Sequence, residues 1–203
     1  MENFNTMAEN FDTARRIERA KWTVKAMRTR IERRNGLSAM EYGCGTGLVG
    51  MELAKDFESI CFIDSSPGML EQVDKKIKSL GLTTASTLCC DIMEEAINAH
   101  FDYIFASLVL HHIDDTQGIL TRLLDLLNPG GHLVVVDLDK EDGGFHAKYP
   151  DFRGHNGYCQ SELIELAREV GFSGAYVETF YHGSKEHAGK VSAYSLFVFD
   201  GQK

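Results

Sequence analysis

Apolar and polar positions along the chain follow a repeating order of strand-like and helix-like segments. Short apolar runs that end near Gly, Asp or Ser predict strands at residues 38–42, 59–63, 83–89, 102–107 and 132–138. Amphipathic stretches between and after them predict helices at residues 46–55, 67–80, 116–127 and 161–170. Strands that alternate with helices pair in parallel, with helices on both faces of the sheet.

The C-terminal end has a different pattern. Residues 175–181 and 192–199 read as two strands, and no helix is predicted in the connection at residues 182–191. A connection this short allows only antiparallel pairing. We therefore expect an α/β fold with a mostly parallel, seven-stranded sheet and an antiparallel C-terminal hairpin.

The N-terminal segment predicts one amphipathic helix at residues 13–34. Asp12 is the expected N-cap, and Gly36 is the expected stop. No linker rich in Pro, Gly or Ser separates this helix from the rest of the chain. We expect a single domain over residues 1–203, with residues 1–36 docked on it as a helical cap. The apolar stripe consists of Ile17, Ala20, Val24, Met27 and Ile31.

Composition narrows the classes of protein. The 203 residues are 43% apolar and 25% charged, which is typical of a folded soluble domain. The net charge of −9 disfavours general binding to nucleic acid or to an anionic membrane. We find no apolar run long enough for a transmembrane helix and no secretory signal pattern, and the odd count of 5 cysteines lacks a CxxC pair. A cytoplasmic location is expected.

Three closely spaced glycines, Gly43, Gly45 and Gly47, follow the first predicted strand, and a helix is predicted to begin there. Glycine permits positive φ and a close approach of backbone to ligand, and a helix start offers free N–H groups. In an open parallel sheet, this strand end lies where ligands bind. The dinucleotide fingerprint Gly-x-Gly-x-x-Gly needs glycine where Leu48 stands, which weakens a nicotinamide interpretation.

Three carboxylates stand at or near the ends of three successive predicted strands. Glu41 precedes the glycines, Asp64 ends the second strand and Asp91 follows the third. Carboxylates can attract an ammonium group and accept hydrogen bonds from a sugar diol and from an exocyclic amine. They suit a ligand with an amine, a ribose and an adenine, and they suit a pyrophosphate poorly. The simpler alternatives are that Asp64 only caps a helix and that Asp91 is a solvated loop acid.

These segments together resemble the ordered motifs of class I S-adenosylmethionine-dependent methyltransferases, in particular a small-molecule branch that includes ubiquinone-biosynthesis-like enzymes. The resemblance rests on E-Y-G-C-G-T-G at residues 41–47, Asp64 with residues 65–70, Asp91 with Ile92, and L-N-P-G-G at residues 127–131. It implies a Rossmann-like fold, S-adenosyl-L-methionine as cofactor, and methyl transfer to a small molecule.

The resemblance also implies roles for individual residues. Gly43, Gly45 and Gly47 would wrap the methionine part of the cofactor. Glu41 would lie near its amino group, and Asp64 would hold the ribose.

The remaining implied cofactor contacts concern the adenine. Ser65 and Met69 would line the adenine, and Asp91 would accept from its amine, with Ile92 packed beside it. These roles come from the resemblance alone.

Two further residues are implied on the side of methyl transfer. Ser107, at the end of the fourth strand, would face the methyl group. Phe11 matches an aromatic residue that often closes over the cofactor, and its alternative is an ordinary core position.

Methyl transfer from a sulfonium is a direct displacement, so the protein mostly supplies position, and a base is needed only for a protonated nucleophile. His112 is the candidate base, preferred over His111. The alternative is that both histidines only hold loop backbone. No metal is expected, because adjacent histidines diverge, no third ligand is evident, and Asp137 with Asp139 lacks a full ligand pattern.

Residues 139–160, rich in glycine, histidine and aromatic residues, are predicted to form a lid over the substrate. The alternative is a surface connection with local packing. Two other functions stay open: a non-catalytic cofactor-binding module whose basic first helix contacts a partner, and an NAD(P)-dependent oxidoreductase. The acceptor atom and the oligomeric state are open as well.

Overall fold

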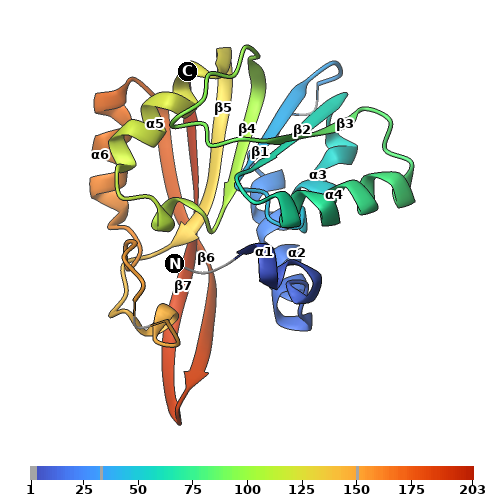
Figure 1. Cartoon of the computed structure of the whole chain (residues 1–203). Helices are drawn as coiled ribbons and strands as arrows, with labels where there is room; N and C mark the ends of the chain where they lie inside the picture. The colour runs from blue at the N-terminus through green and yellow to red at the C-terminus, as the bar shows by residue number, and fades with distance from the viewer. Residues whose placement is uncertain (1–3, 33, 150) are drawn as a thin grey trace.

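The computed structural model describes residues 4–32, 34–149 and 151–203. Within them the chain forms a seven-stranded sheet in the order β3-β2-β1-β4-β5-β7-β6 (Figure 1). β1 to β5 are parallel, and β7 runs antiparallel to both β5 and β6. The predicted fold class is confirmed. The strands are β1 Ser38–Tyr42, β2 Ser59–Asp64, β3 Ala85–Cys89, β4 Phe101–Ser107, β5 Leu127–Leu138, β6 Ser173–His187 and β7 Lys190–Gln202.

Helices cover both faces of the sheet, which explains the apolar runs at residues 103–106 of β4 and 133–136 of β5. On one face, Met27 of α2 and Val73 of α4 pack with Phe105 of β4. On the other face, Leu120 of α5 packs with Ile104 of β4. The helices are α1 Phe4–Met7, α2 Ala14–Arg28, α3 Gly50–Leu53, α4 Pro67–Leu80, α5 Thr116–Asp125 and α6 Gln160–Val170.

The N-terminal helix differs from its prediction at both ends. Thr13 is the N-cap of α2, because its side chain accepts from the Arg16 amide at 3.4 Å. The prediction that Asp12 caps this helix is therefore wrong. The helix also ends at Arg28 and not at residue 34. Among the described residues, no helix is long and apolar enough to cross a membrane.

The segment after the glycines is less helical than predicted. A helix was expected over residues 46–55, but α3 begins only at Gly50, and a short 3-10 turn over Ala54–Asp56 follows it. The glycines themselves form turns with positive φ, so the chain completes a loop before the first regular helical turn. The loop thus lies over the strand ends as irregular backbone.

The C-terminal hairpin is longer than predicted. The expected connection at residues 182–191 is wrong, because β6 and β7 stay paired down to His187 opposite Lys190. Only Ala188 and Gly189, both with positive φ, form the turn. Figure 1 shows the hairpin extending well past the carboxyl ends of the parallel strands, next to the segment around residue 145. The hairpin therefore adds a wall beside this edge of the sheet.

Candidate functional site

The glycine loop crosses the ends of β1 and β2. Gly43, Gly45 and Gly47 have φ of +61°, +53° and +74°, a region that favours glycine. The Gly45 amide donates to Oδ2 of Asp64 at 2.8 Å. The loop is therefore fastened to the neighbouring strand end by Asp64.

Asp64 connects the loop to the start of α4. Its other oxygen, Oδ1, accepts from the Ser66 amide at 2.8 Å. The N-cap of α4 is Ser66, whose side chain accepts from the Met69 amide at 3.3 Å. Burial raises the pKa of Asp64, while the hydrogen bonds from Ser66 and Gly45 act against that rise. Asp64 therefore orders two backbone segments at once, and Ser66 is the capping residue.

Glu41 lies beneath the loop and is only 2% exposed. Its Oε2 accepts from the Gly50 amide at 3.2 Å. A Cβ atom at Gly50 would collide with this carboxylate, so the absence of a side chain at Gly50 permits the contact. Burial raises the pKa of Glu41 from about 4.5 to about 8. The expected contact with an ammonium group stays a prediction; in the structure, Glu41 holds the start of α3.

Asp91 is exposed at the same edge of the sheet, just after β3, and its Oδ1 accepts from the Met93 amide at 3.0 Å. Ile92 beside it is buried. Burial raises the pKa of the Tyr42 phenol, and the charges of Asp91 and Asp64 raise it further. Cys89 of β3 pairs with Asp64 of β2, so Asp64 and Asp91 lie at the ends of neighbouring strands, as the sequence predicts.

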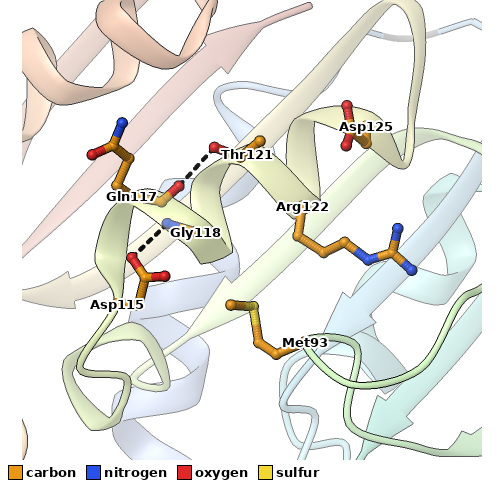
Figure 2. A pocket seen from close by; sticks show the side chains of 7 residues that line it. All are labelled: Met93, Asp115, Gln117, Gly118, Thr121, Arg122 and Asp125. Carbon is orange, nitrogen blue, oxygen red and sulfur yellow. Dashed lines mark hydrogen bonds between the residues drawn. The ribbon is translucent and has the colours of Figure 1, made fainter.

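Arg122 of α5 holds the segment that carries Asp91 and Ile92. Its Nε donates to the Ile92 carbonyl and its Nη2 to the Glu95 carbonyl, both at 2.9 Å. The sequence pattern offered no signal for this role, because the two partners are backbone atoms. Figure 2 shows the Arg122 side chain beside an open hollow that also exposes Met93.

That hollow has a volume of about 480 Å³ and lies between α5 and the chain after β3 (Figure 2). Its walls come mostly from the exposed side of α5, where Asp115 caps the helix by accepting from the Gly118 amide at 2.8 Å. None of the predicted site residues lines it. The candidate site is therefore at the glycine loop and not in this hollow.

The N-terminal segment covers the start of α4. Oδ1 of Asn5 accepts from the Ser66 hydroxyl at 2.7 Å and from the Gly68 amide at 2.9 Å. The Phe11 ring lies over the loop, 3.8 Å from the position a Cβ of Gly45 would take. Residues 4–11 thus form a cover over the glycine loop and the start of α4. Asn5 binds the first turn of α4 although the two are far apart in sequence, so no local sequence pattern predicts this contact.

A polar contact fastens this cover to the loop. Asp12 accepts from the Thr46 hydroxyl at 2.5 Å and pairs with Lys76 of α4 at 2.7 Å. Lys76 also donates to the Thr46 carbonyl at 2.7 Å. This explains why Asp12 does not cap α2: its carboxylate is engaged with the loop and α4.

The chain after β4 presses against the glycine loop. Ser107 ends β4 and is half-buried, and Leu108 has a positive φ of +55°. The Val109 side chain occupies the space where a Cβ of Gly43 would lie. Residues 107–109 therefore form one side of the site, and Phe4 of the cover contacts His112 just beyond them.

His111 and His112 follow in a 3-10 turn, Leu110–His112. His111 is 1% exposed, and its Nδ1 lies 2.5 Å from Oδ1 of Asp137 in β5. His112 is half-buried, and burial, reinforced by the neighbouring His111, lowers its pKa to about 4. An imidazole with so low a pKa is a weak base near neutral pH. The structure therefore does not favour His112 as a general base, and the base role stays a prediction.

The segment at residues 139–160 folds back over these histidines. The Tyr158 hydroxyl donates to the Leu110 carbonyl at 2.8 Å, and the His155 amide donates to the His111 carbonyl at 2.7 Å. Pro150 lies outside the described residues. The role of residues 139–160 as a lid over the substrate stays a prediction.

His146 belongs to the same segment and completes a cluster of three imidazoles. It is 6% exposed, and its ring stacks on Phe152 with centroids 3.7 Å apart. Its ring centroid lies 5.0 Å from that of His111 and 5.6 Å from that of His112. Burial lowers its pKa to about 3, and the charges of His111 and His112 act in the same direction. Sequence spacing gave no sign of this neighbour, because the loop is irregular.

Comparisons with known proteins agree with this arrangement. Residues 40–133 match a family model described as a methyltransferase domain. An uncharacterized methyltransferase of Schizosaccharomyces pombe is 29% identical over 160 residues, covering 71% of this chain and 56% of that protein. The chain spans about half the length of the curated relatives it matches.

Solved structures share the fold. A SAM-dependent methyltransferase from Aquifex aeolicus superimposes with a TM-score of 0.69 at 17% identity, covering 98% of this chain and 97% of that chain. Phosphoethanolamine N-methyltransferase 2 of Haemonchus contortus, in complex with S-adenosyl-L-methionine, gives 0.73 at 16% identity, covering 89% and 51%. Over residues 40–133 the chain is similar to methyltransferase domains, and its ordered motifs and strand order resemble those of class I S-adenosylmethionine-dependent methyltransferases.

Proposed function

We propose that this protein binds S-adenosyl-L-methionine at the glycine loop and transfers its methyl group to a small-molecule acceptor. The observation that supports this most strongly is the glycine-rich loop that Asp64 fastens at one edge of the sheet, with Asp91 following the neighbouring strand end and Phe11 lying over the loop. When bound, the cofactor supplies a methyl group on a positively charged sulfur.

The donor and acceptor groups present suit this cofactor. A carboxylate offers about four acceptor positions, and Asp64 uses two of them on backbone amides, so it can still accept from a ribose diol. Asp91 is exposed and can accept from an adenine amine, while Met69 and Ile92 supply buried apolar contacts. Gly43, Gly45 and Gly47 with Ser65 complete the proposed contacts.

The chain's own contribution to transfer is position. Val109 against Gly43 places Ser107 and the following histidines directly beside the loop. Closing residues 139–160 over that side would hold an acceptor in line with the methyl group and exclude water. The acidic net charge of −9 favours a small molecule over nucleic acid.

Cofactor binding is tested by calorimetry of the full chain with S-adenosylmethionine and with its demethylated product. The Asp64→Asn variant should bind both about tenfold more weakly, since it loses a charged acceptor that is worth roughly 1–3 kcal/mol. Glu94→Gln, an exposed change of the same charge, should bind as the wild type does. No heat and no thermal shift with either ligand would contradict the proposal.

Methyl transfer is tested separately with radiolabelled cofactor and a panel of small amines, phenols, acids and thiols. The proposal expects label in at least one of them. Label found only in added RNA or protein would overturn the small-molecule acceptor. Cofactor binding without transfer to any acceptor would favour a non-catalytic module.

A further inference from the structure

We propose that His111, His112 and His146 together bind a divalent transition-metal ion such as Zn²⁺. One ring nitrogen of each lies within 4.8 Å of those of the other two. Three imidazoles are an established donor set for zinc, at about 2.0–2.1 Å per bond. The third ligand comes from the loop at residues 139–160, which is why the sequence alone argued against a metal.

Two ring nitrogens of this cluster have no hydrogen-bond partner among the described residues. Nε2 of His111 and Nδ1 of His146 are buried and make no hydrogen bond there. A buried polar atom without a partner costs roughly 1–3 kcal/mol, so such atoms are rare unless something binds them. A metal ion between the rings would satisfy both at once.

Asp137 supplies the support that a metal-binding histidine usually has. Its Oδ1 lies 2.5 Å from Nδ1 of His111, and its two oxygens also accept from the amides of Leu138 and His111 at 2.8 and 3.2 Å. A carboxylate on Nδ1 fixes the tautomer and leaves the lone pair of Nε2 for a metal. The unpartnered atom of His111 is that same Nε2.

The surrounding charges are compatible with a cation. The Asp137 carboxylate is fully buried next to the cluster, and neutral imidazole is the form of histidine that binds metals. Lys185 of β6 opposes a cation, but its ammonium is engaged by the Phe145 carbonyl at 2.9 Å and lies over the Phe145 ring. Tetrahedral zinc needs its nitrogens about 3.4 Å apart, which small ring rotations would achieve.

Three histidines leave one coordination position open. His111 and His112 follow Ser107 and Val109 in the chain, so we assign the open position to the acceptor side of the glycine loop. This assignment, unlike metal binding itself, rests on the proposed function. An ion there would bind an oxygen or sulfur acceptor and favour loss of its proton to solvent, so that no side-chain base is needed.

Metal binding is tested on the untagged, metal-free full chain, with Zn²⁺ titrated against a chromogenic chelator. We expect one ion per wild-type chain. His112→Gln and His146→Gln should each weaken binding at least tenfold, and Asp137→Asn by about 10–100-fold although all three ligands remain. His182→Gln, an exposed histidine on β6, should bind as the wild type does. Circular dichroism verifies that each variant is folded.

Unchanged zinc affinity in both His112→Gln and His146→Gln, or no ion bound by the wild type, would overturn the site. The demethylated cofactor is titrated into the same samples. Cofactor binding without zinc binding would remove the metal site and leave the proposed function intact. Zinc binding without cofactor binding would keep the metal site and contradict the proposed function.

Discussion

Nδ1 of His111 and Oδ1 of Asp137 lie 2.5 Å apart, and the two side chains are 1% and 0% exposed. The pair joins the turn after β4 to the carboxyl end of β5. Although burial alone would raise it, the pKa of Asp137 is lowered by His111 and by the amides of Leu138 and His111. The pair therefore belongs to the most constrained part of the site.

Asp137→Asn should lower the free energy of unfolding by roughly 3 kcal/mol, because it leaves a buried partner incompletely satisfied. The chain offers a matched control in Asp200, whose Oδ1 lies 2.9 Å from Nδ1 of His132 in a pair that is 16–18% exposed. Asp200→Asn should cost less than about 1 kcal/mol. Urea unfolding measures both, and equal losses would show that the buried pair has no special weight.

Glu41 predicts a pH dependence. Its pKa is raised by burial to about 8 in the folded protein, against about 4.5 ordinarily, so the folded state holds a proton that the unfolded state releases. Stability contributed at this site should therefore fall as pH rises from about 4.5 to about 8. In Glu41→Gln this dependence should vanish, so the variant should gain on the wild type across that range.

The measurement is the free energy of unfolding at several pH values for wild type, Glu41→Gln and the exposed control Glu94→Gln. The control should follow the wild type. A wild type that gains stability relative to Glu41→Gln with rising pH would mean that Glu41 is ionised in the fold.

A side chain at Gly43 should destabilise the protein in two ways, through backbone strain and through a collision with Val109. Its φ of +61° costs about 1–2 kcal/mol for a residue with a side chain, and a Cβ would also collide with Val109. Gly43→Ala should thus lose stability and cofactor affinity, and adding Val109→Ala should restore the packing part only. Gly81, with φ of +65° and open space around it, is the control for backbone strain alone.

The free energy of unfolding and the affinity for demethylated cofactor together separate the backbone strain from the collision with Val109. Gly81→Ala should cost about 1 kcal/mol and leave cofactor affinity unchanged. If Gly43→Ala behaved like Gly81→Ala in both measurements, the contact with Val109 would carry no functional weight.

Because Asn5 fastens the N-terminal cover to α4, we predict that this cover controls cofactor release. Asn5→Ala removes the acceptor for the Ser66 hydroxyl and the Gly68 amide, each worth about 1 kcal/mol. Amide exchange over residues 4–12 should accelerate, and the demethylated cofactor should dissociate faster. Asn10→Ala, at an exposed position of the same segment, should change neither. Unchanged dissociation in Asn5→Ala would mean that the cover does not gate the site.

The order of elements, the parallel sheet with its antiparallel end, and the glycine loop with Asp64 and Asp91 at neighbouring strand ends were all predictable from the sequence. These features depend on local periodicity, on turn residues and on the rule that parallel strands end at one edge. The extent of the hairpin was not predictable, because cross-strand pairing over residues 182–191 decides it.

Tertiary structure alone decided which atoms meet. Asp12 binds Thr46 and Lys76 and does not cap α2. Glu41 accepts from the Gly50 amide, and the irregular loop after β5 places His146 beside His111. Such contacts join residues far apart in the chain through buried hydrogen bonds, whose partners no local pattern specifies. The local sequence therefore determines which side chains stand at the strand ends. The packing of the cover and of the loop at residues 139–160 onto the sheet determines which hydrogen-bond partners those side chains have.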